Sequence, residues 1–110
     1  MEREPLAGQT ALDADGRIVA PGDVVAQFEQ ALRNLLAALQ AAGGRPEHLV
    51  TMTTYIVDVP DYREHARDIG RVWRELVGTR YPAMAGIGVA RLWDDDALVE
   101  VQGVAVVPDA

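Results

Sequence analysis

Two polar residues, Glu100 and Gln102, interrupt a run of valine, alanine and leucine near the C-terminal end of the chain. The run has the composition of a β-strand. A carboxylate or an amide within such a strand lowers stability unless it is hydrogen-bonded, hydrated or used for binding. Glu100 is therefore the first candidate for a functional site. The alternatives are a solvent-facing or ion-paired carboxylate for Glu100 and a hydrogen-bonded structural amide for Gln102.

The other side chains that commonly do chemistry are absent or poorly placed. All ten basic residues are arginine, so a Schiff-base lysine is excluded. The chain has no cysteine, which excludes a thiol nucleophile, a disulfide framework and thiolate metal ligands. His48 and His65 do not have the spacing of metal ligands, so we expect no metal site.

The charge of the chain limits its partners. Seventeen acidic residues outweigh ten basic ones, for a formal net charge of −7, and the densest cluster is acidic, at Asp94 to Asp96. Nucleic acids and anionic membranes are polyanions that favour basic surfaces, so we expect neither as a partner. The first residues lack the apolar segment of a signal peptide, and no run approaches the roughly 18 apolar residues of a membrane span. We therefore expect a cytoplasmic protein.

The first half of the sequence predicts a loop followed by a long amphipathic helix. At 110 residues the chain has the length of a single domain. Residues 13–22 contain closely spaced glycine, proline and aspartate, which favour a hairpin or an irregular loop. From Asp23 to about Ala42 apolar residues recur at helical spacing, with Gln27 and other polar residues on the opposite side. Asp23 is a candidate N-cap, and the glycine pair that follows Ala42 is a candidate stop signal.

The second half predicts three strands and one more helix. Residues 48–59 are rich in β-branched side chains and alternate as a strand does. Asp61 is a candidate cap for a helix that ends near Gly78. The candidate core positions of that helix are His65, Ile69, Val72, Trp73 and Leu76. Strands over about residues 84–92 and 97–107, separated by an acidic turn, favour an antiparallel hairpin.

Together these elements predict an α+β fold with one sheet and both helices packed on one face. The other face would present Thr, Tyr, Met, Val and Ala rather than charged residues. An exposed sheet face of that composition usually marks an interface, so we expect self-association. In a closed homo-oligomer the clefts between subunits are natural ligand sites.

Several segments, in their order and spacing, resemble the RidA/YjgF family over roughly residues 6 to 108. They are Gly8-Gln9, the helix from Val24 that ends Leu39-Gln40-Ala41-Ala42-Gly43-Gly44, the strand from Val50 to Asp58, the Tyr81-Pro82-Ala83 entry and the terminal Leu98-Val99-Glu100-Val101. The resemblance implies a chorismate-mutase-like α+β fold with one mixed sheet. It also implies a homotrimer whose sheets pack around a central core, with ligand sites in the clefts between subunits.

The resemblance also implies an activity. Typical members hydrolyse reactive enamines and imines that pyridoxal-phosphate enzymes make from amino acids, releasing ammonia and a 2-oxo acid without a cofactor. In those members an arginine after the Pro-Ala pair binds the substrate carboxylate, and a glutamate on the last strand positions or activates water. Glu100 matches that glutamate, so the resemblance makes it the candidate catalytic residue. The candidate substrate-binding residues are Gly8, Gln9, Met84, Ala85 and Gln102.

The chain departs from the family pattern after Pro82-Ala83. Met84 stands where typical members have the arginine, and Ala85 replaces the usual small hydroxyl residue. Methionine cannot pair with a carboxylate, and it is expected to be core or an apolar pocket wall. Arg91 would face the opposite side of the strand from position 84 unless a bulge intervenes.

Two functions stay open from the sequence. The first is a Rid-type hydrolase for an imine or enamine that lacks the usual carboxylate or holds it differently, with Glu100 handling the water. The second is a non-catalytic trimer that binds small apolar or weakly polar ligands in a cleft without the arginine. In both, residues 1–110 form one domain whose N-terminal strand is shorter than in typical members.

Overall fold

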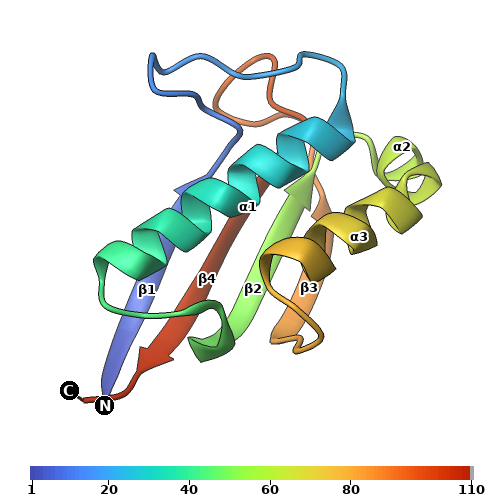
Figure 1. Ribbon diagram of the computed structural model, residues 1–110. Coiled ribbons are helices and arrows are strands. Elements are labelled where there is room, and N and C mark those ends of the chain that lie inside the picture. The colour runs from blue at the N-terminus through green and yellow to red at the C-terminus, as the bar shows by residue number, and fades with distance from the viewer. Residues whose placement is uncertain (110) are drawn as a thin grey trace.

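A four-stranded mixed sheet with helices on one face forms the frame of the molecule, whose computed structural model describes residues 1–109 (Figure 1). The elements in chain order are β1 (Glu2–Gln9), α1 (Val24–Ala41), the 3₁₀ turn η1 (Pro46–His48), β2 (Leu49–Ile56), α2 (Val59–Glu64), α3 (Ala66–Leu76), β3 (Ala83–Gly88) and β4 (Val99–Val107). The strand order is β1-β4-β2-β3. The α+β fold with one mixed sheet is thus confirmed. None of the helices among residues 1–109 has the length and apolar content to cross a bilayer.

The long helix α1 begins and ends as its sequence predicts. Asp23 is the N-cap, and its Oδ1 accepts a hydrogen bond of 3.0 Å from the Ala26 N–H. After the helix Gly43 takes φ +85°, a left-handed conformation that favours glycine. The apolar stripe of α1 lies on the sheet, with Phe28, Leu32 and Leu35 almost completely buried.

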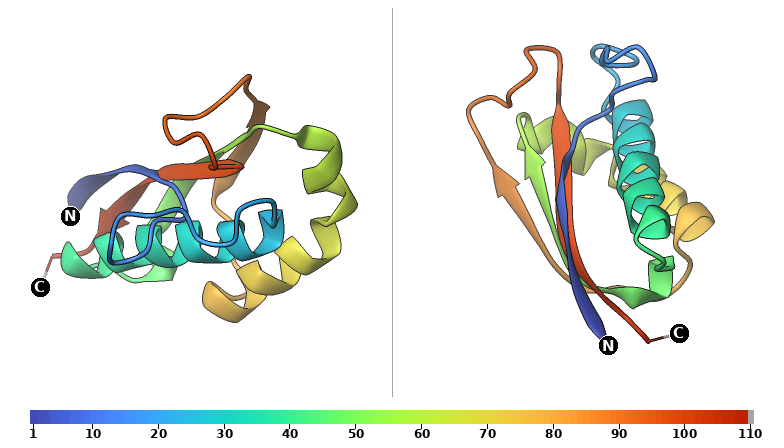
Figure 2. Two further views of the ribbon diagram at one scale, coloured as in Figure 1. Left: turned by 90° about the horizontal axis from the view of Figure 1, so that it is seen from above. Right: turned by 90° about the vertical axis from the view of Figure 1, so that its left-hand side faces the viewer.

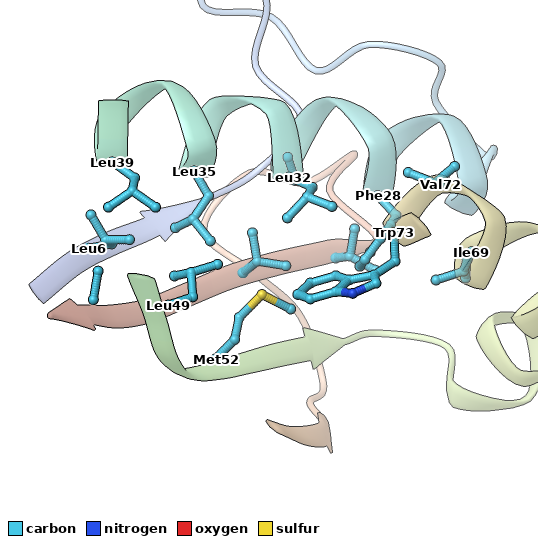
Figure 3. Packing of buried hydrophobic residues seen from close by; sticks show 14 of the residues in the cluster. Leu6, Phe28, Leu32, Leu35, Leu39, Leu49, Met52, Ile69, Val72 and Trp73 are labelled. Carbon is cyan, nitrogen blue, oxygen red and sulfur yellow. The ribbon is translucent and has the colours of Figure 1, made fainter. Parts of the chain in front are cut away.

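The core lies between this helical layer and the sheet. Alternate residues of β4 point into it, so that Val99, Val101 and Ala105 are completely buried beneath α1. Met52 of β2 is buried on the same face, and Trp73 of α3 closes the core (Figure 3). The intervening residues of β4, which include Glu100 and Gln102, therefore lie on the face that no helix covers.

The expected hairpin between the last two strands is wrong. β3 pairs in parallel with β2, and β4 pairs antiparallel with both β1 and β2, so β2 separates β3 from β4. The side chains account for this order. β4 alternates valine and alanine that α1 can bury, whereas β3 is made largely of alanine and glycine and is exposed at all six positions. A strand with so little apolar surface takes the edge of the sheet.

The second predicted helix is divided into α2 and α3 at His65, and its cap is Asp58 rather than Asp61. The Asp58 Oδ1 accepts a hydrogen bond of 3.1 Å from the Asp61 N–H. The helix begins earlier than predicted because Pro60 is well suited to the first turn of a helix. Ile69 and Trp73 are buried as predicted.

His65 is not a core residue, since its side chain is 42% exposed at the junction between the two helices. A hydrogen bond to the Asp61 carbonyl raises the pKa of His65, and the Asp61 carboxylate 3.3 Å away acts in the same direction. Its polar surroundings explain why it stays at the surface.

Gln27, predicted on the polar side of the helix, is completely buried. Its Nε2 donates to the carbonyls of Ala20 at 3.3 Å and Asp96 at 3.0 Å, and its Oε1 accepts the Leu98 N–H at 2.8 Å. The amide thus holds two loops from distant parts of the chain against the start of α1. It can be buried because its polar atoms are paired.

Replacing Gln27 with Leu is expected to lower the free energy of unfolding by about 2–4 kcal/mol, because it leaves the Leu98 N–H and the Asp96 carbonyl without their partner. Urea denaturation followed by circular dichroism measures the change. The matched control is Gln40→Leu, at an exposed position of the same helix, with an expected change within about 0.5 kcal/mol. Equal stability losses in the two variants would contradict the role given to Gln27.

Candidate functional site

Glu100 lies on the open face of the sheet, the face away from α1. It is paired across the ladder with Tyr55 of β2, and the two buried neighbours of Glu100 in β4 point the other way. Among residues 1–109 no arginine, histidine or terminal amine forms an ion pair with its carboxylate. An ion-paired carboxylate, one of the alternatives for Glu100, is therefore not found among residues 1–109.

The Glu100 side chain lies directly over the backbone of Gly8. A Cβ placed on Gly8 would be 2.9 Å from Cδ of Glu100 and 3.1 and 3.2 Å from its two carboxylate oxygens. The pairing of β1 with β4 shifts register between Leu6 and Gln9, so Gly8 falls within this irregular segment. The Glu100 carboxylate can occupy this position because Gly8 has no side chain.

Gln102 extends the polar patch along the open face. Its Nε2 donates a 3.0 Å hydrogen bond to the hydroxyl oxygen of Tyr55, and it is paired across the ladder with Thr53. A shallow concavity of about 370 Å³ lies beside this pair. Its lining residues are Pro5, Leu6, Ala7, Thr51, Thr53, Gln102, Gly103 and Val104. This face thus combines a free carboxylate, a phenol and an amide with an apolar surface.

The remaining candidate residues divide between the two faces. Ala85 is paired with Thr53 and so shares the open face with Gln102. Gln9 is paired with the buried Val101, which puts it on the helix side, and its Nε2 bonds the Ala7 carbonyl at 3.3 Å. The open face therefore brings together Gly8, Ala85, Glu100 and Gln102 but not Gln9.

Met84 also lies away from Glu100. It is paired with Met52, which is buried under the helices, whereas Glu100 is paired with Tyr55 on the opposite face. β2 separates the two strands as well. Within one chain, Met84 and Glu100 therefore cannot contact the same small ligand.

Arg91 does not replace the missing arginine within the chain. The pairing of β3 with β2 is continuous from Ala83 to Gly88, without the bulge that could have turned Arg91 toward position 84. Arg91 follows the end of the strand, is exposed, and forms no ion pair within residues 1–109. Although the Asp94 to Asp96 cluster is close to Arg91 in the sequence, no ion pair joins them within the described residues.

The loop of residues 89–98 connects β3 to β4 and extends to the side of the sheet away from α1 (Figure 2). It is held at its base by a 3.2 Å hydrogen bond from the Thr10 hydroxyl to Asp94. Trp93 in this loop is 94% exposed. An indole in that position has contact area available for a ligand or a second subunit.

Sequence reasoning missed an aromatic pocket on the helix side of Met84. Met84 is 46% exposed and lines it together with side chains from α1, α2, α3 and the segment before β3. The apolar spacing of each helix predicts only that its apolar residues are buried. That these residues lie next to Met84 depends on the pairing of β3 with β2. Within residues 1–109, no group of three His, Asp or Glu side chains is arranged to bind a metal.

A single mixed sheet with helices on one face is the chorismate-mutase-like α+β arrangement that the resemblance implies (Figure 1). The family model described as Endoribonuclease L-PSP matches residues 5–107. The chain belongs to this family, the RidA/YjgF or Rid family, as its resemblance indicates.

Three known proteins illustrate the match. A RutC family protein of Synechocystis is 39% identical over 103 residues, covering 93% of this chain and 76% of the relative. The 2-iminobutanoate/2-iminopropanoate deaminase of Capra hircus is 32% identical over 102 residues, covering 92% of this chain and 70% of the relative. The structure of the Rid family protein YyfB from Yersinia pestis superposes with a TM-score of 0.86 at 30% identity, covering 97% of this chain and 80% of that one.

Proposed function

We propose that this protein hydrolyses reactive imines or enamines to a carbonyl compound and ammonia, in a cleft formed between subunits, with Glu100 positioning the attacking water. Its substrate lacks the usual carboxylate or holds it differently. The observation that supports a catalytic Glu100 is the placement of its carboxylate on Gly8, without an ion-pair partner among residues 1–109. A free carboxylate on a rigid strand can accept a proton from water. The goat relative named as an imine deaminase supports the reaction class.

The cleft requires more than one copy of the chain. Met84 and Glu100 lie on opposite faces with β2 between them, so they meet at one ligand only if they come from two subunits. The open face has Tyr55 and Val104 half-buried and Thr51 exposed in the single chain. We therefore propose a homotrimer in which the open faces pack toward the centre, and clefts form where neighbours meet.

RNA cleavage, which the description of the family model suggests, finds less support. The chain has a formal net charge of −7, and a polyanionic substrate would be repelled by it. A small uncharged or singly charged ligand does not meet electrostatic repulsion of this size. The proposed reaction also needs no cofactor, because water is the only other reactant.

The direct test is ammonia release from freshly generated imines. The purified chain should accelerate ammonia release above the buffer rate for at least one imine or enamine, with 2-aminoacrylate and an uncharged imine assayed in parallel. If neither the natural chain nor a Met84→Arg variant exceeds the buffer rate, the hydrolase proposal fails and the ligand-binding alternative gains support.

Trp93 provides a test of the assembly, which we expect to be a trimer by light scattering. In a Trp73→Phe variant, Trp93 is the only indole, because the chain has two tryptophans. A Trp93 that is 94% exposed in the single chain should be protected from acrylamide quenching if a neighbour covers it. Dilution that dissociates the assembly should then restore quenching. A monomer by light scattering at all concentrations would rule out the inter-subunit cleft.

A further inference from the structure

The pocket next to Met84, here called the aromatic pocket, is an apolar cavity of about 200 Å³ at the edge of the sheet. Its lining residues are Phe28, Tyr62, Ala66, Ile69, Gly70, Trp73, Tyr81 and Met84. None of these side chains carries a charge. Ala66 and Gly70 are the two smallest, so space remains between the rings and the helix.

Two aromatic pairs form the walls of the aromatic pocket. Phe28 and Tyr62 meet edge to face, with ring centroids 6.3 Å apart and planes at 74°. Trp73 and Tyr81 are stacked, with centroids 5.7 Å apart and planes at 12°. The Met84 thioether adds a polarizable group that packs well against rings. Such a lining favours a flat or branched hydrocarbon group.

The polar groups of the aromatic pocket are poor partners for a carboxylate. The Trp73 indole N–H already donates to the Arg80 carbonyl at 3.3 Å. Burial raises the pKa of Tyr62, which keeps its hydroxyl neutral. Arg74 reaches the rim, where its Nη1 would lie 3.4 Å from a Cβ on Gly70. It is exposed there, and an ion pair in contact with water contributes little.

The size of the aromatic pocket limits what it can hold. A 150 Å³ cavity lined by apolar side chains is known to bind benzene. A pocket of about 200 Å³ therefore has room for a phenyl ring or a branched alkyl group of similar size. A longer ligand would extend past Met84, which is 46% exposed, toward the neighbouring subunit of the proposed trimer.

We propose that the aromatic pocket binds the hydrocarbon group of an uncharged aralkyl imine, and that Met84 selects this class over imines that carry a carboxylate. This inference rests on the proposed function. The feature of the structure that supports it is that the position of the missing arginine lines an uncharged cavity built from two aromatic pairs.

The chemistry of this ligand class fits hydrolysis. The oxygen of water bonds to the imine carbon, the nitrogen takes up the protons of that water, and the carbon–nitrogen bond then breaks. An aldehyde and ammonia leave, and no electrons are gained or lost. An imine of this kind arises when a primary amine loses two electrons and two protons. A reaction that can supply the substrate is therefore the two-electron oxidation of an aralkyl primary amine, in which a separate oxidant accepts the electrons.

Binding can be measured separately from catalysis. In a Trp93→Phe background Trp73, which lines the aromatic pocket, is the only indole. Titration with phenylacetamide, a stable uncharged probe, should change its fluorescence saturably. Phenylacetate should bind about tenfold more weakly or worse, because its charge finds no buried partner. Ala66→Leu, which fills the pocket, should weaken phenylacetamide binding about tenfold or more, whereas Ala41→Leu at an exposed position of α1 should leave it unchanged.

Three results of the binding titrations would each overturn the inference. They are the absence of saturable binding, equal binding of phenylacetate and phenylacetamide, and binding that Ala66→Leu does not weaken. A change of oligomeric state in Ala66→Leu without probe binding would also overturn it, since the pocket would then receive a second copy of the chain. Ammonia release from 2-aminoacrylate without phenylacetamide binding would reject this inference and leave the proposed hydrolase intact. Specific phenylacetamide binding without ammonia release from any imine would support the pocket and reject the hydrolase.

Discussion

Replacing Glu100 with Gln should reduce the rate of ammonia release by about 10²–10⁴-fold on the best substrate of the natural chain. The amide has nearly the shape of the carboxylate but cannot accept a proton from the attacking water. The side chain is held over Gly8 on a regular strand, so the substitution should leave the geometry of the strand intact. The initial rate of ammonia release at saturating substrate measures the effect.

The matched control for this variant is Glu2→Gln, which changes an exposed carboxylate in β1. Both variants remove one negative charge, so a shared loss of rate would reflect net charge rather than a site. We expect the control to retain the natural rate, and both variants to unfold within about 0.5 kcal/mol of the natural chain. Full activity in Glu100→Gln would exclude Glu100 as the catalytic group.

A Gly8→Ala variant tests whether the position of the Glu100 carboxylate matters for activity, because it changes the backbone contact and leaves Glu100 itself unchanged. The added Cβ would lie 2.9 Å from Cδ of Glu100, and the flexible end of the glutamate side chain would have to move. The rate should fall while stability changes little. A structural role for Glu100 would predict the reverse, a loss of stability with no selective loss of rate.

The parts of the fold that depend on neighbouring residues follow from the sequence. The helix from Asp23 is predictable because its cap, its apolar spacing and its terminal glycine all act within a few residues. The alternation in β4 likewise places Glu100 on the face opposite Val99 and Val101. The pairing of β3 with β2 is not predictable in this way, since it joins segments separated by two helices.

The candidate site, too, was predictable only where it depends on residues that are neighbours in the sequence. The position of Glu100 on a strand face follows from a period of two, but its contact with Gly8 depends on an irregular pairing of β1 with β4. Gln27 has the composition of a surface residue and is buried only because two distant loops supply its partners. Met84 was expected to be core or a pocket wall, and the rings that surround it come from elements far apart in the chain.

Replacing Met84 with Arg should raise the specificity constant for imines that carry a carboxylate, such as 2-aminoacrylate, by about 10–100-fold. The introduced guanidinium would supply a charge-assisted pair of about 1.5–3 kcal/mol, and each 1.4 kcal/mol corresponds to tenfold. The rate for an uncharged aralkyl imine should fall at the same time, because a charge would enter the aromatic pocket. A Met84→Leu variant, which keeps the site apolar, should gain nothing on carboxylate substrates.

A subunit-mixing experiment identifies which chains form the cleft that gains activity. A double variant with Met84→Arg and Glu100→Gln should be inactive alone on 2-aminoacrylate, and the natural chain should have only its low rate. If equal amounts of the two chains assemble at random into trimers, roughly a quarter of all clefts would join the introduced arginine of one chain to the natural Glu100 of another. Activity above that of either parent would therefore appear after the two proteins are unfolded and refolded together. If position 84 and Glu100 acted within one chain, the mixture would gain nothing, because no chain contains both groups.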